Sequence, residues 1–558
     1  MFITQGARQN RLHGFRRAFA ARLLSLLLLL ALPAMVQAQF TFITNNGAIT
    51  ITGYQMRSVG AVVIPSTTNG YPVTSIGNDA FFNGQGIYSK LTSVTIPNSV
   101  TNVGDGAFAE CGGLTNITIG TNVINIGTDA FQACNGLTNI AIPASVISIG
   151  NEAFADCGHL TAITIDTNNP TYSSVAGVLF DKSQATLIQC PGGKVGSFTV
   201  PNTVSSIGTN AFRYCTALTN ITITAGVTNI GYETFEYCAS LTTITVNTNN
   251  STYSSPAGVL FDKSQTTLIQ YPENRVGSYT IPDSVVCIGD EAFFDSSGLT
   301  NVIIGTNVTS IGDYAFSRCG LTSAIISNSI TIIGDDAFYK CPNLNSVSIG
   351  DSATSIGSWT FADCNSLTSV TIGNGVTSIG SGDFQFCTTL TNVTIGNNVT
   401  SIGMAAFEGC YKLTGVMIPD TVTNIGYEAF LNFHLVSVFF LGNAPAVDSS
   451  AFSYDAATAY YLPGTTGWGN FAASTGLPTA LWLPQVQTSN TSFGMQTNQF
   501  GFNINWASGQ TVVVEACTDI SNPVWQPVQT NTLASGASYF SDSQWTNYPG
   551  RFYRLRSP

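Results

Sequence analysis

Apolar and polar residues follow one pattern that returns at a nearly fixed interval through most of the chain. The pattern is Ile-Gly-x-x-Ala-Phe-x-x-Cys-x-x-Leu-Thr-x-Val-Thr-Ile-x-x-x-Val-Thr-x. Its glycine lies at positions 77, 104, 127, 150, 208, 231, 289, 312, 334, 357, 380, 403 and 426, most often 23 residues apart. A period of this length predicts a solenoid, in which each unit buries its apolar side chains only against its neighbours.

Within one unit the pattern predicts a strand and a turn. In residues 114–119, Leu-Thr-Asn-Ile-Thr-Ile, the aliphatic side chains have the spacing of core-facing positions. Asn116 and Thr118 then point outward, because alternate residues of a strand lie on opposite faces. Stacked units should form a parallel sheet. Residues 129–131 are expected to begin a short helical turn whose phenylalanine fills the interior, with carboxylates capping the start of such turns.

The outward strand positions are candidate binding residues. They are small, polar and uncharged, and they lack the Trp, Tyr and Arg that dominate protein-binding hot spots. This face either binds glycan or matrix weakly through hydrogen bonds, or is inert while edges and hairpins make the contacts. The candidates on the strand face are Asn116, Thr118, Asn220, Thr222, Ser369, Thr371, Asn392 and Thr394.

Two repeats are longer by 35 residues, and their insertions match each other. They fall in segments 166–200 and 247–281. Each contains Gly-Val-Leu-Phe-Asp-Lys-Ser-Gln followed by Thr-Leu-Ile-Gln, which predicts a β-hairpin. Insertions in solenoids tend to share a face, so Tyr172 and Tyr253 are further candidate contact residues. The alternative is that these segments are merely longer coils.

The segments that flank the repeats differ from them. Residues 39–72 predict a hairpin around an Asn-Asn-Gly turn, which would cap the first coil of an array spanning residues 73–441. Residues 442–483 lose the period and are expected to form the C-terminal cap. Residues 484–558 predict a small β-sandwich, which is a candidate surface-sorting module. Its Arg551, Arg554 and Arg556 either serve that role or line the solvent face of the last strand.

The amino terminus predicts export. Residues 1–38 combine several arginines, an almost pure leucine run and small residues before Ala38 and Gln39, the expected cleavage site. The leucine run is too short to span a membrane, and no later segment is long and apolar enough. Arg16-Arg17 leaves a twin-arginine signal as an alternative to general secretion. We therefore expect a secreted or cell-surface protein without a transmembrane segment in the mature chain.

Charge narrows the classes of partner. Only 9% of the 558 residues are charged, against a typical ~25%, and the net charge is −12. Five of the 18 basic residues lie within the first 22 positions. Such a chain has no cationic surface able to neutralise a run of phosphates, so we expect no nucleic-acid partner. Three histidines are a small supply for acid/base chemistry or metal ligation.

Thirteen cysteines in an exported chain invite a disulfide interpretation. Ten of them lie seven residues after the repeat glycine, a position that elsewhere holds Gly84, Ser296 or Phe433. That position favours buried thiols packed as small apolar side chains, and no Cys-x-x-Cys pair suggests a metal. The predicted cysteine ladder consists of Cys111, Cys134, Cys157, Cys215, Cys238, Cys319, Cys341, Cys364, Cys387 and Cys410. Cys190, Cys287 and Cys517 fall outside it.

The repeat closely resembles the BspA-type, or treponemal-type, leucine-rich repeat of bacterial surface proteins. The resemblance rests on Ile-Gly-Asn-Glu-Ala-Phe-Ala-Asp-Cys at 149–157 and Leu-Thr-Ser-Val-Thr-Ile at 367–372. It runs from about residue 73 to about residue 452. It implies a secreted or surface-displayed, non-catalytic interaction protein, and some members bind host matrix proteins or other cells. The repeat itself does not reveal the ligand.

Together these features predict a leucine-rich repeat solenoid with a hairpin cap and a small C-terminal β-sandwich-like domain. We interpret the chain as a non-enzymatic binding or adhesion protein whose partner is an extracellular protein or polysaccharide. The alternative is a structural component of the cell surface or extracellular matrix without a specific ligand. No nucleophile elbow, phosphate loop or HExxH motif is present in the sequence, and no cofactor or metal is expected. The oligomeric state is left open.

Overall fold

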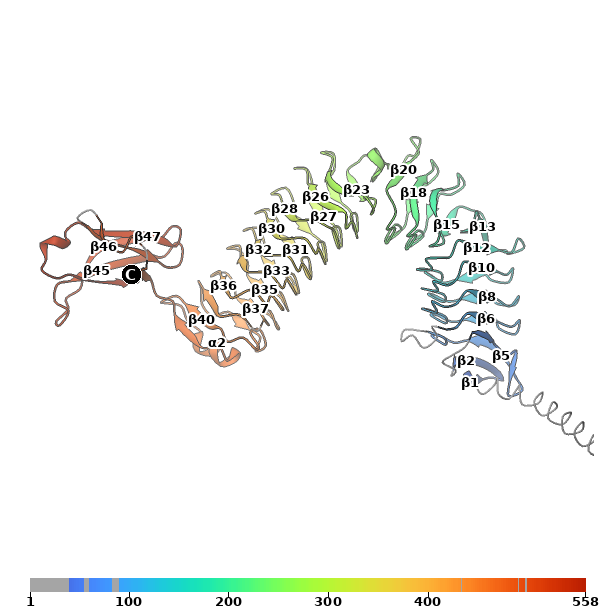
Figure 1. The fold of residues 1–558 in the computed structure, drawn as a ribbon, viewed down its shortest axis with the longest axis horizontal. Coiled ribbons are helices and arrows are strands. Elements are labelled where there is room, and N and C mark those ends of the chain that lie inside the picture. The colour runs from blue at the N-terminus through green and yellow to red at the C-terminus, as the bar shows by residue number, and fades with distance from the viewer. Residues whose placement is uncertain (1–39, 55–59, 83–89, 433, 490, 497–498) are drawn as a thin grey trace, which may run out of the picture. The chain divides into compact units, whose positions relative to one another are not determined.

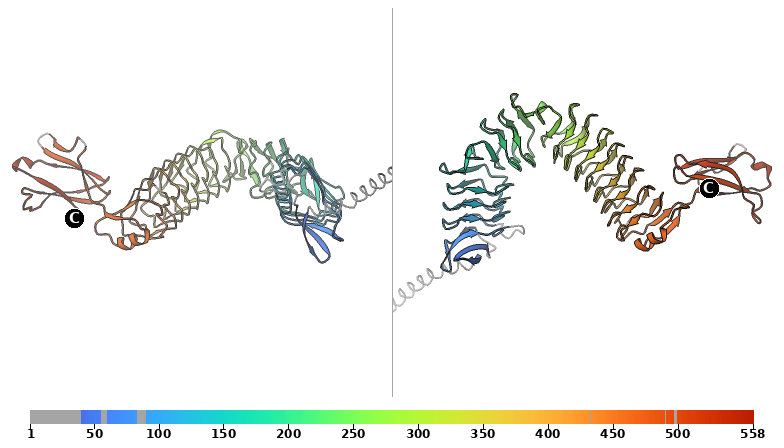
Figure 2. Two further views of the ribbon diagram at one scale, coloured as in Figure 1. Left: turned by 60° about the horizontal axis from the view of Figure 1, so that its bottom comes forward. Right: turned by 180° about the vertical axis from the view of Figure 1, so that it is seen from behind.

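The computed structural model describes residues 40–54, 60–82, 90–432, 434–489, 491–496 and 499–558. The predicted signal peptide, with Ala38 and Gln39, lies outside these residues. The chain divides into two compact units, Met1–Arg275 and Val276–Pro558. Within each unit, short strands and turns stack coil upon coil (Figure 1), and the two further views show the same stacking (Figure 2).

One wall of the coils is built from the Leu-Thr-x-Val-Thr-Ile segments, which form parallel strands. In the first unit these strands are β3 (Ala61–Val63), β6 (Ser93–Thr95), β8 (Asn116–Thr118), β10 (Asn139–Ile142), β12 (Ala162–Ile165), β16 (Gly196–Thr199), β18 (Leu218–Ile223) and β20 (Thr243–Val246). In the second unit they are β24 (Gly277–Thr280), β26 (Leu299–Ile303), β28 (Ser323–Ile326), β30 (Ser346–Ile349), β32 (Ser369–Thr371), β34 (Asn392–Thr394), β36 (Gly415–Ile418), β38 (Ser437–Phe440), β40 (Thr458–Tyr461) and β41 (Thr479–Leu481).

A second wall is built from the short segments that precede the repeat glycine. In the first unit these are β5 (Tyr71–Ile76), β7 (Asn102–Val103), β9 (Asn125–Ile126), β11 (Ser148–Ile149), β17 (Ser206–Ile207) and β19 (Asn229–Ile230). In the second unit they are β25 (Cys287–Ile288), β27 (Ser310–Ile311), β29 (Ile332–Ile333), β31 (Ser355–Ile356), β33 (Ser378–Ile379), β35 (Ser401–Ile402), β37 (Asn424–Ile425) and β39 (Ala446–Val447).

The core between the walls is a column of identical side chains. Phe108 stacks on Phe131 with a centroid distance of 5.4 Å in the first unit. In the second unit Phe338, Phe361 and Phe384 stack at 5.2 and 5.5 Å. These rings are fully buried among Leu, Ile, Val and Ala side chains. Because equivalent residues pair in register, each coil continues the apolar column of the coil before it.

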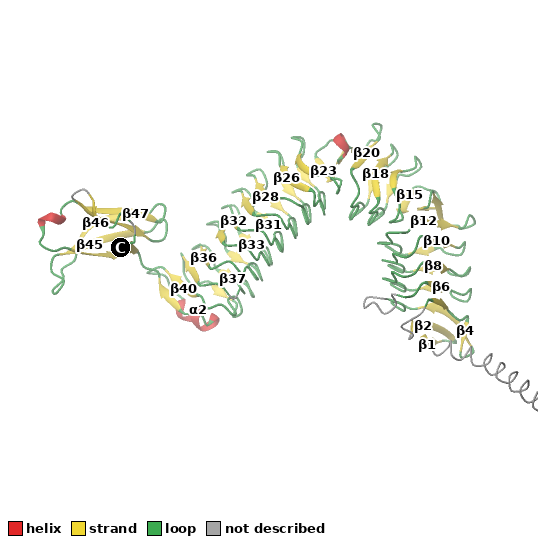
Figure 3. Ribbon diagram, in the orientation of Figure 1, coloured by secondary structure: helices red, strands yellow, loops and turns green. Residues whose placement is uncertain are grey.

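The segments expected to be short helical turns are hydrogen-bonded turns that contain left-handed residues (Figure 3). In the coil that begins at Gly127, Asp129 and Ala133 both have φ near 54°. The amide groups of Asp129 and Ala133 donate to carbonyl groups of the next coil, at 3.1 and 2.9 Å. The turn is therefore held between coils, and carboxylates occupy positions where Asp and Asn tolerate a left-handed backbone.

Other acidic residues link successive turns directly. The residue after the repeat glycine accepts an amide hydrogen bond from the next coil through its side-chain oxygen. Asp290 accepts from Asp313, Asp313 from Asp335, and Asp335 from Ser358, at 3.0, 2.8 and 2.7 Å. These carboxylates satisfy backbone donors of the next coil and not those of a helix start in their own coil, so the capping role expected from the sequence takes a different form.

The first unit carries the predicted hairpins. β1 (Phe40–Asn45) pairs antiparallel with β2 (Ala48–Tyr54) over the first coil, and β4 (Thr67–Thr68) pairs with β5. The two long repeats form antiparallel strands as well. These are β13 (Tyr172–Val175), β14 (Val178–Asp181) and β15 (Thr186–Gln189) in the first long repeat, and β21 (Tyr253–Ser254), β22 (Leu260–Asp262) and β23 (Thr267–Gln270) with the 3-10 turn η1 (Pro256–Gly258) in the second.

The second unit ends in a helix and a two-sheet domain. Among the described residues α2 (Trp468–Thr475) is the only α-helix, and its buried Trp468 and Phe471 rings contact Phe440. The domain that follows has a small core including Phe502, Val514 and Phe540. Its elements are β42 (Gln485–Gln487), β43 (Gly494–Gln496), β44 (Gln499–Asn505), β45 (Thr511–Cys517), β46 (Gln526–Thr532), β47 (Ala537–Asp542), η2 (Trp545–Asn547) and β48 (Phe552–Arg556).

Candidate binding surface

The outward strand residues chosen from the sequence lie in three separate places. Asn116 and Thr118 are exposed on β8, and Asn220 and Thr222 are half-buried on β18, both in the first unit. The remaining four lie on β32 and β34 in the second unit. There Ser369 pairs with Asn392 and Thr371 with Thr394. The structure therefore brings only these last four together.

Threonines that lie beside the outward pairs have a different role. The hydroxyl of Thr391 donates to the carbonyl oxygen of Thr368 at 3.0 Å, and Thr368 donates in the same way to Asn345. These hydroxyl groups are used within the array. The side chains of Thr371, Asn392 and Thr394 are exposed. Within the described part of the chain they make no hydrogen bond to protein. Their donors and acceptors are therefore available to a ligand.

A groove crosses this face of the second unit. One hollow of about 450 Å³ is lined by residues that include Asn392, Thr394, Asn397, Met417 and Phe439. A second hollow of about 420 Å³ extends over β32 and β30 to Asn328, just after β28, and shares Thr394 and Asn397 with the first. The two hollows thus form one continuous depression over neighbouring strands.

The first hollow is uncharged and the second nearly so. All the residues that line the first hollow are neutral. The second contains one carboxylate, Asp351, whose Oδ1 accepts the amide hydrogen of Asn374 at 2.7 Å. In a chain with a net charge of −12, this groove is a neutral, hydrogen-bonding part of the surface.

An apolar platform adjoins the groove, and the sequence analysis missed it. Met417 on β36 pairs with Phe439 on β38, which pairs with Tyr460 on β40. The Phe439 ring stacks on Tyr460 at 5.1 Å and contacts Trp482 at 4.7 Å. The statement that the outward face lacks aromatic side chains is therefore wrong at this end of the sheet. Extending the strand register through the segment assigned to the cap would have revealed Tyr460.

The two hairpin tyrosines lie elsewhere and are held by the backbone. Each is half-buried, and each hydroxyl accepts an amide hydrogen bond from the coil 23 residues earlier. Tyr172 accepts from Ile149 at 3.0 Å, and Tyr253 accepts from Ile230 at 3.1 Å. Both side chains thus take part in stacking the long repeats, and their role in contacting a partner stays a prediction.

The cysteine ladder lies inside the coils. Nine of its ten thiols donate to the carbonyl oxygen of a core phenylalanine one coil earlier, as Cys364 does to Phe338 at 3.2 Å. Cys215 is the exception and contacts the carbonyl groups of Cys190 and Pro191. All thirteen cysteines are free thiols, and only Cys287 is not fully buried. Burial raises the pKa of the Cys111 and Cys157 thiols to about 12.

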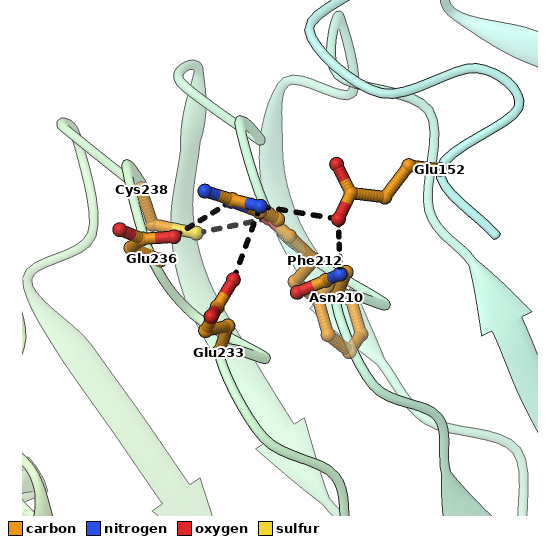
Figure 4. A network of polar contacts seen from close by, with 7 residues as sticks. Glu152, Asn210, Phe212, Glu233, Glu236 and Cys238 are labelled. Atoms are coloured by element: carbon orange, nitrogen blue, oxygen red, sulfur yellow. Dashed lines mark hydrogen bonds and ion pairs between the residues drawn. The ribbon is translucent and has the colours of Figure 1, made fainter. Parts of the chain in front are cut away.

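A polar network in the first unit joins three coils around one cation (Figure 4). The Arg213 guanidinium lies 3.1 Å from Glu152, 3.0 Å from Glu233 and 2.6 Å from Glu236. Its side chain is 19% exposed, and it packs over the stacked rings of Tyr214 and Tyr237. Burial by itself would lower the pKa of Arg213, but the negative charges of these three carboxylates outweigh it and raise the pKa. The network clamps successive turns together.

The comparison with protein-family models settles the classification of the repeats. The model described as "BspA type Leucine rich repeat region (6 copies)" matches residues 54–186, 190–276, 271–358 and 331–459. The chain belongs to the BspA-type leucine-rich repeat family. The comparison with curated proteins gives no match. The leucine-rich repeats therefore span most of both units.

Solved structures of bacterial leucine-rich repeat proteins are similar to this family member. A leucine-rich cell surface protein from Faecalibacterium prausnitzii is 31% identical, over 70% of this chain and 93% of its own, with a TM-score of 0.43. A leucine-rich repeat protein from Bacteroides ovatus is 23% identical over 79% and 98%, with a TM-score of 0.37. The pneumococcal vaccine antigen PcpA is 19% identical over 79% and 96%, with a TM-score of 0.39.

Outside the leucine-rich repeats, the arginines of the last strand are paired with acids. Arg554 and Arg556 lie 2.7 and 2.8 Å from Glu515, and Arg551 lies 3.0 Å from Asp542. Hydrogen bonds from Arg556 and Arg554 hold the pKa of the Glu515 carboxyl below its ordinary value. Much of this positive charge is therefore neutralised locally, and the sorting role of the C-terminal domain stays a prediction.

In the residues that the structure describes, no helix combines the length and apolar character that a membrane span requires. The same residues contain no group of three or more His, Cys, Asp or Glu side chains placed to hold a metal ion.

Thiol burial leads to a direct expectation. In the native chain, iodoacetamide should modify Cys287 at most, because the other thiols are buried and only thiolates react. Alkylation in denaturant should reach all thirteen cysteines. Mass spectrometry of tryptic peptides measures both reactions. Rapid native labelling of Cys319 or Cys364, at a rate comparable to Cys287, would contradict the buried ladder.

The Arg213 network should contribute measurably to stability. Arg213→Ala leaves three carboxylates facing one another without their cation, in a partly buried site. We expect a loss of about 2 kcal/mol, between the values for exposed and buried ion pairs. Arg318→Ala is the matched control, because Arg318 is 44% exposed beside Asp295 and should lose less than about 1 kcal/mol. Equal losses in urea unfolding would show that the network is no stronger than a surface pair.

Proposed function

We propose that this chain is a non-catalytic, secreted or cell-surface binding protein that contacts an extracellular protein or polysaccharide through the outward face of its second unit. The observation that carries the proposal is the groove over β30 to β38. There, free hydrogen-bonding side chains such as Asn392 and Thr394 lie beside the exposed Met417 and the Phe439 ring. Ligand sites typically combine apolar surface with a few placed polar groups in this way.

The contrast with the rest of the repeat supports the proposal. The threonines that precede the outward pairs donate their hydroxyl groups to carbonyl oxygens of the previous coil, as Thr368 and Thr391 do. Those hydroxyl groups are structural requirements of the fold. The outward residues Thr371, Asn392 and Thr394 on β32 and β34 make no such bonds, and they coincide with a depression. A stack of coils also provides the extended surface that repeat proteins use for large partners.

Export is part of the same proposal. The predicted signal peptide supports a location outside the cytoplasm, as does the similarity to a leucine-rich cell surface protein from Faecalibacterium prausnitzii. Free thiols are compatible with that location because they are buried in the coils and kept neutral. The mode of surface attachment is not part of the proposal.

The test is a binding screen with the purified full-length mature chain. Polysaccharides and extracellular matrix proteins are immobilised, and the wild-type chain is compared with Met417→Glu and Ile303→Glu. Both variants place a carboxylate on an exposed outward strand position of the second unit, but only Met417 lines the groove. We expect Met417→Glu to weaken binding at least tenfold, and Ile303→Glu to stay within twofold of wild type.

Two outcomes would overturn the proposal. Binding that Met417→Glu leaves unchanged would place the contact outside the groove. No binding to any immobilised partner at high micromolar protein would favour the alternative of a structural surface component without a specific ligand. Thermal unfolding of both variants, within a few degrees of wild type, shows that the coils remain folded.

A further inference from the structure

We infer that the groove takes an extended, uncharged polysaccharide of β-1,4-linked pyranose units, lying across the strands in the direction in which the coils stack. This inference rests on the proposed function and names its ligand class. Three independent features of the groove carry it: neutrality, an apolar platform for sugar rings, and the spacing of hydrogen-bonding groups.

The near absence of charge in the groove favours an uncharged partner. The first hollow is lined by neutral residues, and Asp351 is the one charged residue that lines the second. The chain as a whole carries a net charge of −12. Anionic polysaccharides would meet repulsion without any arginine or lysine in the groove to offset it. A cationic ligand would find one carboxylate, already engaged with a backbone amide.

The apolar platform suits the faces of sugar rings. Pyranose rings present C–H groups on one face, and an aromatic ring has a negative face that attracts them. Phe439 lines the hollow beside Met417, and on the side away from β36 its ring stacks on Tyr460 and contacts Trp482. Met417 is 43% exposed and flexible enough to follow the ring surface. A sugar unit can therefore stack at the β36–β38 end of the groove.

The hydrogen-bonding groups recur at the right interval for a polymer. Neighbouring strands lie ~4.8 Å apart, which is close to the length that one pyranose adds to an extended β-1,4-linked chain. Ser348, Thr371 and Thr394 occupy equivalent positions on β30, β32 and β34, so a hydroxyl recurs on each of these three strands. Hydroxyl and amide side chains both donate and accept, as sugar hydroxyl groups do. From Asn328, just after β28, to Leu441, just after β38, the groove crosses five coil spacings, or about 24 Å.

A peptide ligand fits this surface less well. Peptides that add to sheets need a free strand edge, and β32 is paired on both sides by β30 and β34. Protein-binding hot spots also favour arginine beside aromatic rings, and no arginine lines either hollow. The observations therefore favour a polysaccharide over a protein segment, and protein binding becomes an outcome of the test.

The experiment is calorimetric titration of the full-length mature chain with cello-oligosaccharides of two to six units. We expect affinity to rise with each unit up to about five and to level off there, because five units fill about 24 Å. Polygalacturonate oligomers of the same lengths should bind at least tenfold more weakly. Phe439→Ala and Met417→Glu should each reduce affinity for the five-unit chain at least tenfold, and Ile303→Glu should leave it within twofold.

The outcomes separate this inference from the proposed function. If cello-oligosaccharides fail to bind but a matrix protein binds and Met417→Glu weakens it, the ligand class is wrong and the groove remains the binding site. If the charged oligomers bind as well as the neutral ones, the argument from neutrality is wrong. If no ligand of any class binds, both proposals fail. Met417→Glu covers the possibility that Phe439→Ala disturbs the cap, because Met417 lies on the exposed face.

Discussion

Replacing Phe361 with alanine is expected to lower the free energy of unfolding by about 3–5 kcal/mol. Phe361 is fully buried, and its ring lies between Phe338 and Phe384 at 5.2 and 5.5 Å. Alanine removes the apolar contacts and leaves a cavity in the middle of the column. Because each coil contacts only its neighbours, the array loses its coupling at that coil as well as stability.

The measurement is urea unfolding followed by circular dichroism. Phe361→Ala should shift the transition to lower urea and broaden it, since coils on the two sides of the cavity can unfold separately. Phe386→Ala is the control within the next coil, because this phenylalanine is 37% exposed and should change stability by less than about 1 kcal/mol. A Phe361→Ala chain as stable as the Phe386→Ala chain would refute the continuous core.

Replacing Asp383 with alanine is expected to stabilise the chain at neutral pH. Asp383 is fully buried, and desolvation raises its pKa to about 8, against hydrogen bonds from the Gly380 and Thr360 amides at 2.6 and 3.4 Å. The equivalent position, three residues after the repeat glycine, holds alanine in ten other repeats and threonine in Thr234 and Thr360. Alanine is thus compatible with the backbone of the coil.

The direction in which Asp383 changes stability with pH follows from proton binding. Below about pH 4 the carboxyl is neutral in both the folded and unfolded states, and its full contribution to stability is present. Between about pH 4 and pH 8 the unfolded chain releases the proton while the folded chain retains it, so stability falls as pH rises. At pH 7 this loss is on the order of 4 kcal/mol. Asp383→Ala removes that loss.

Thermal unfolding of wild type and Asp383→Ala from pH 4 to pH 9 tests this expectation. The difference between the two proteins isolates Asp383 from the other titrating groups. The variant should gain relative stability steadily up to about pH 8 and then no further. A difference that does not change with pH would show that Asp383 is ionised in the folded chain.

The repeating features of the fold could be predicted from the sequence because the same residue types recur in each coil. Phe361, Cys364 and Leu367 recur at fixed offsets from the repeat glycine, and a position that is apolar in nearly every unit must face the common core. The hairpin around Asn45-Asn46-Gly47 was also predictable, since these residues favour the left-handed turn that joins its strands.

Features that depend on the relation between coils were not accessible. The carboxylates at the start of the turns were interpreted as helix caps, but Asp129 and Glu152 have a left-handed backbone, and the Asp129 amide donates to the next coil. Tyr172 was chosen as a contact residue because it lies in an insertion, and the sequence does not reveal that its hydroxyl accepts the Ile149 amide.

The candidate site shows the same division. Thr371, Asn392 and Thr394 were found because their strands follow the repeat. Phe439 was not singled out although its strand follows the repeat, and Tyr460 was missed because the period breaks at the C-terminal cap while its strand continues the same sheet. A surface that extends past the end of the period is visible only once strand pairing gives the register.

The most direct test of the account is the oxidation of three methionines in the presence of a ligand. Met417, Met404 and Met495 are 43%, 46% and 52% exposed, but only Met417 lines the groove. The chain is treated with hydrogen peroxide, with and without saturating amounts of the tightest partner from the binding screen, and sulfoxide formation is followed by mass spectrometry. We expect the ligand to slow the oxidation of Met417 and of neither other methionine. Bound ligand that leaves Met417 as reactive as before, or that protects Met404 or Met495 instead, would contradict it.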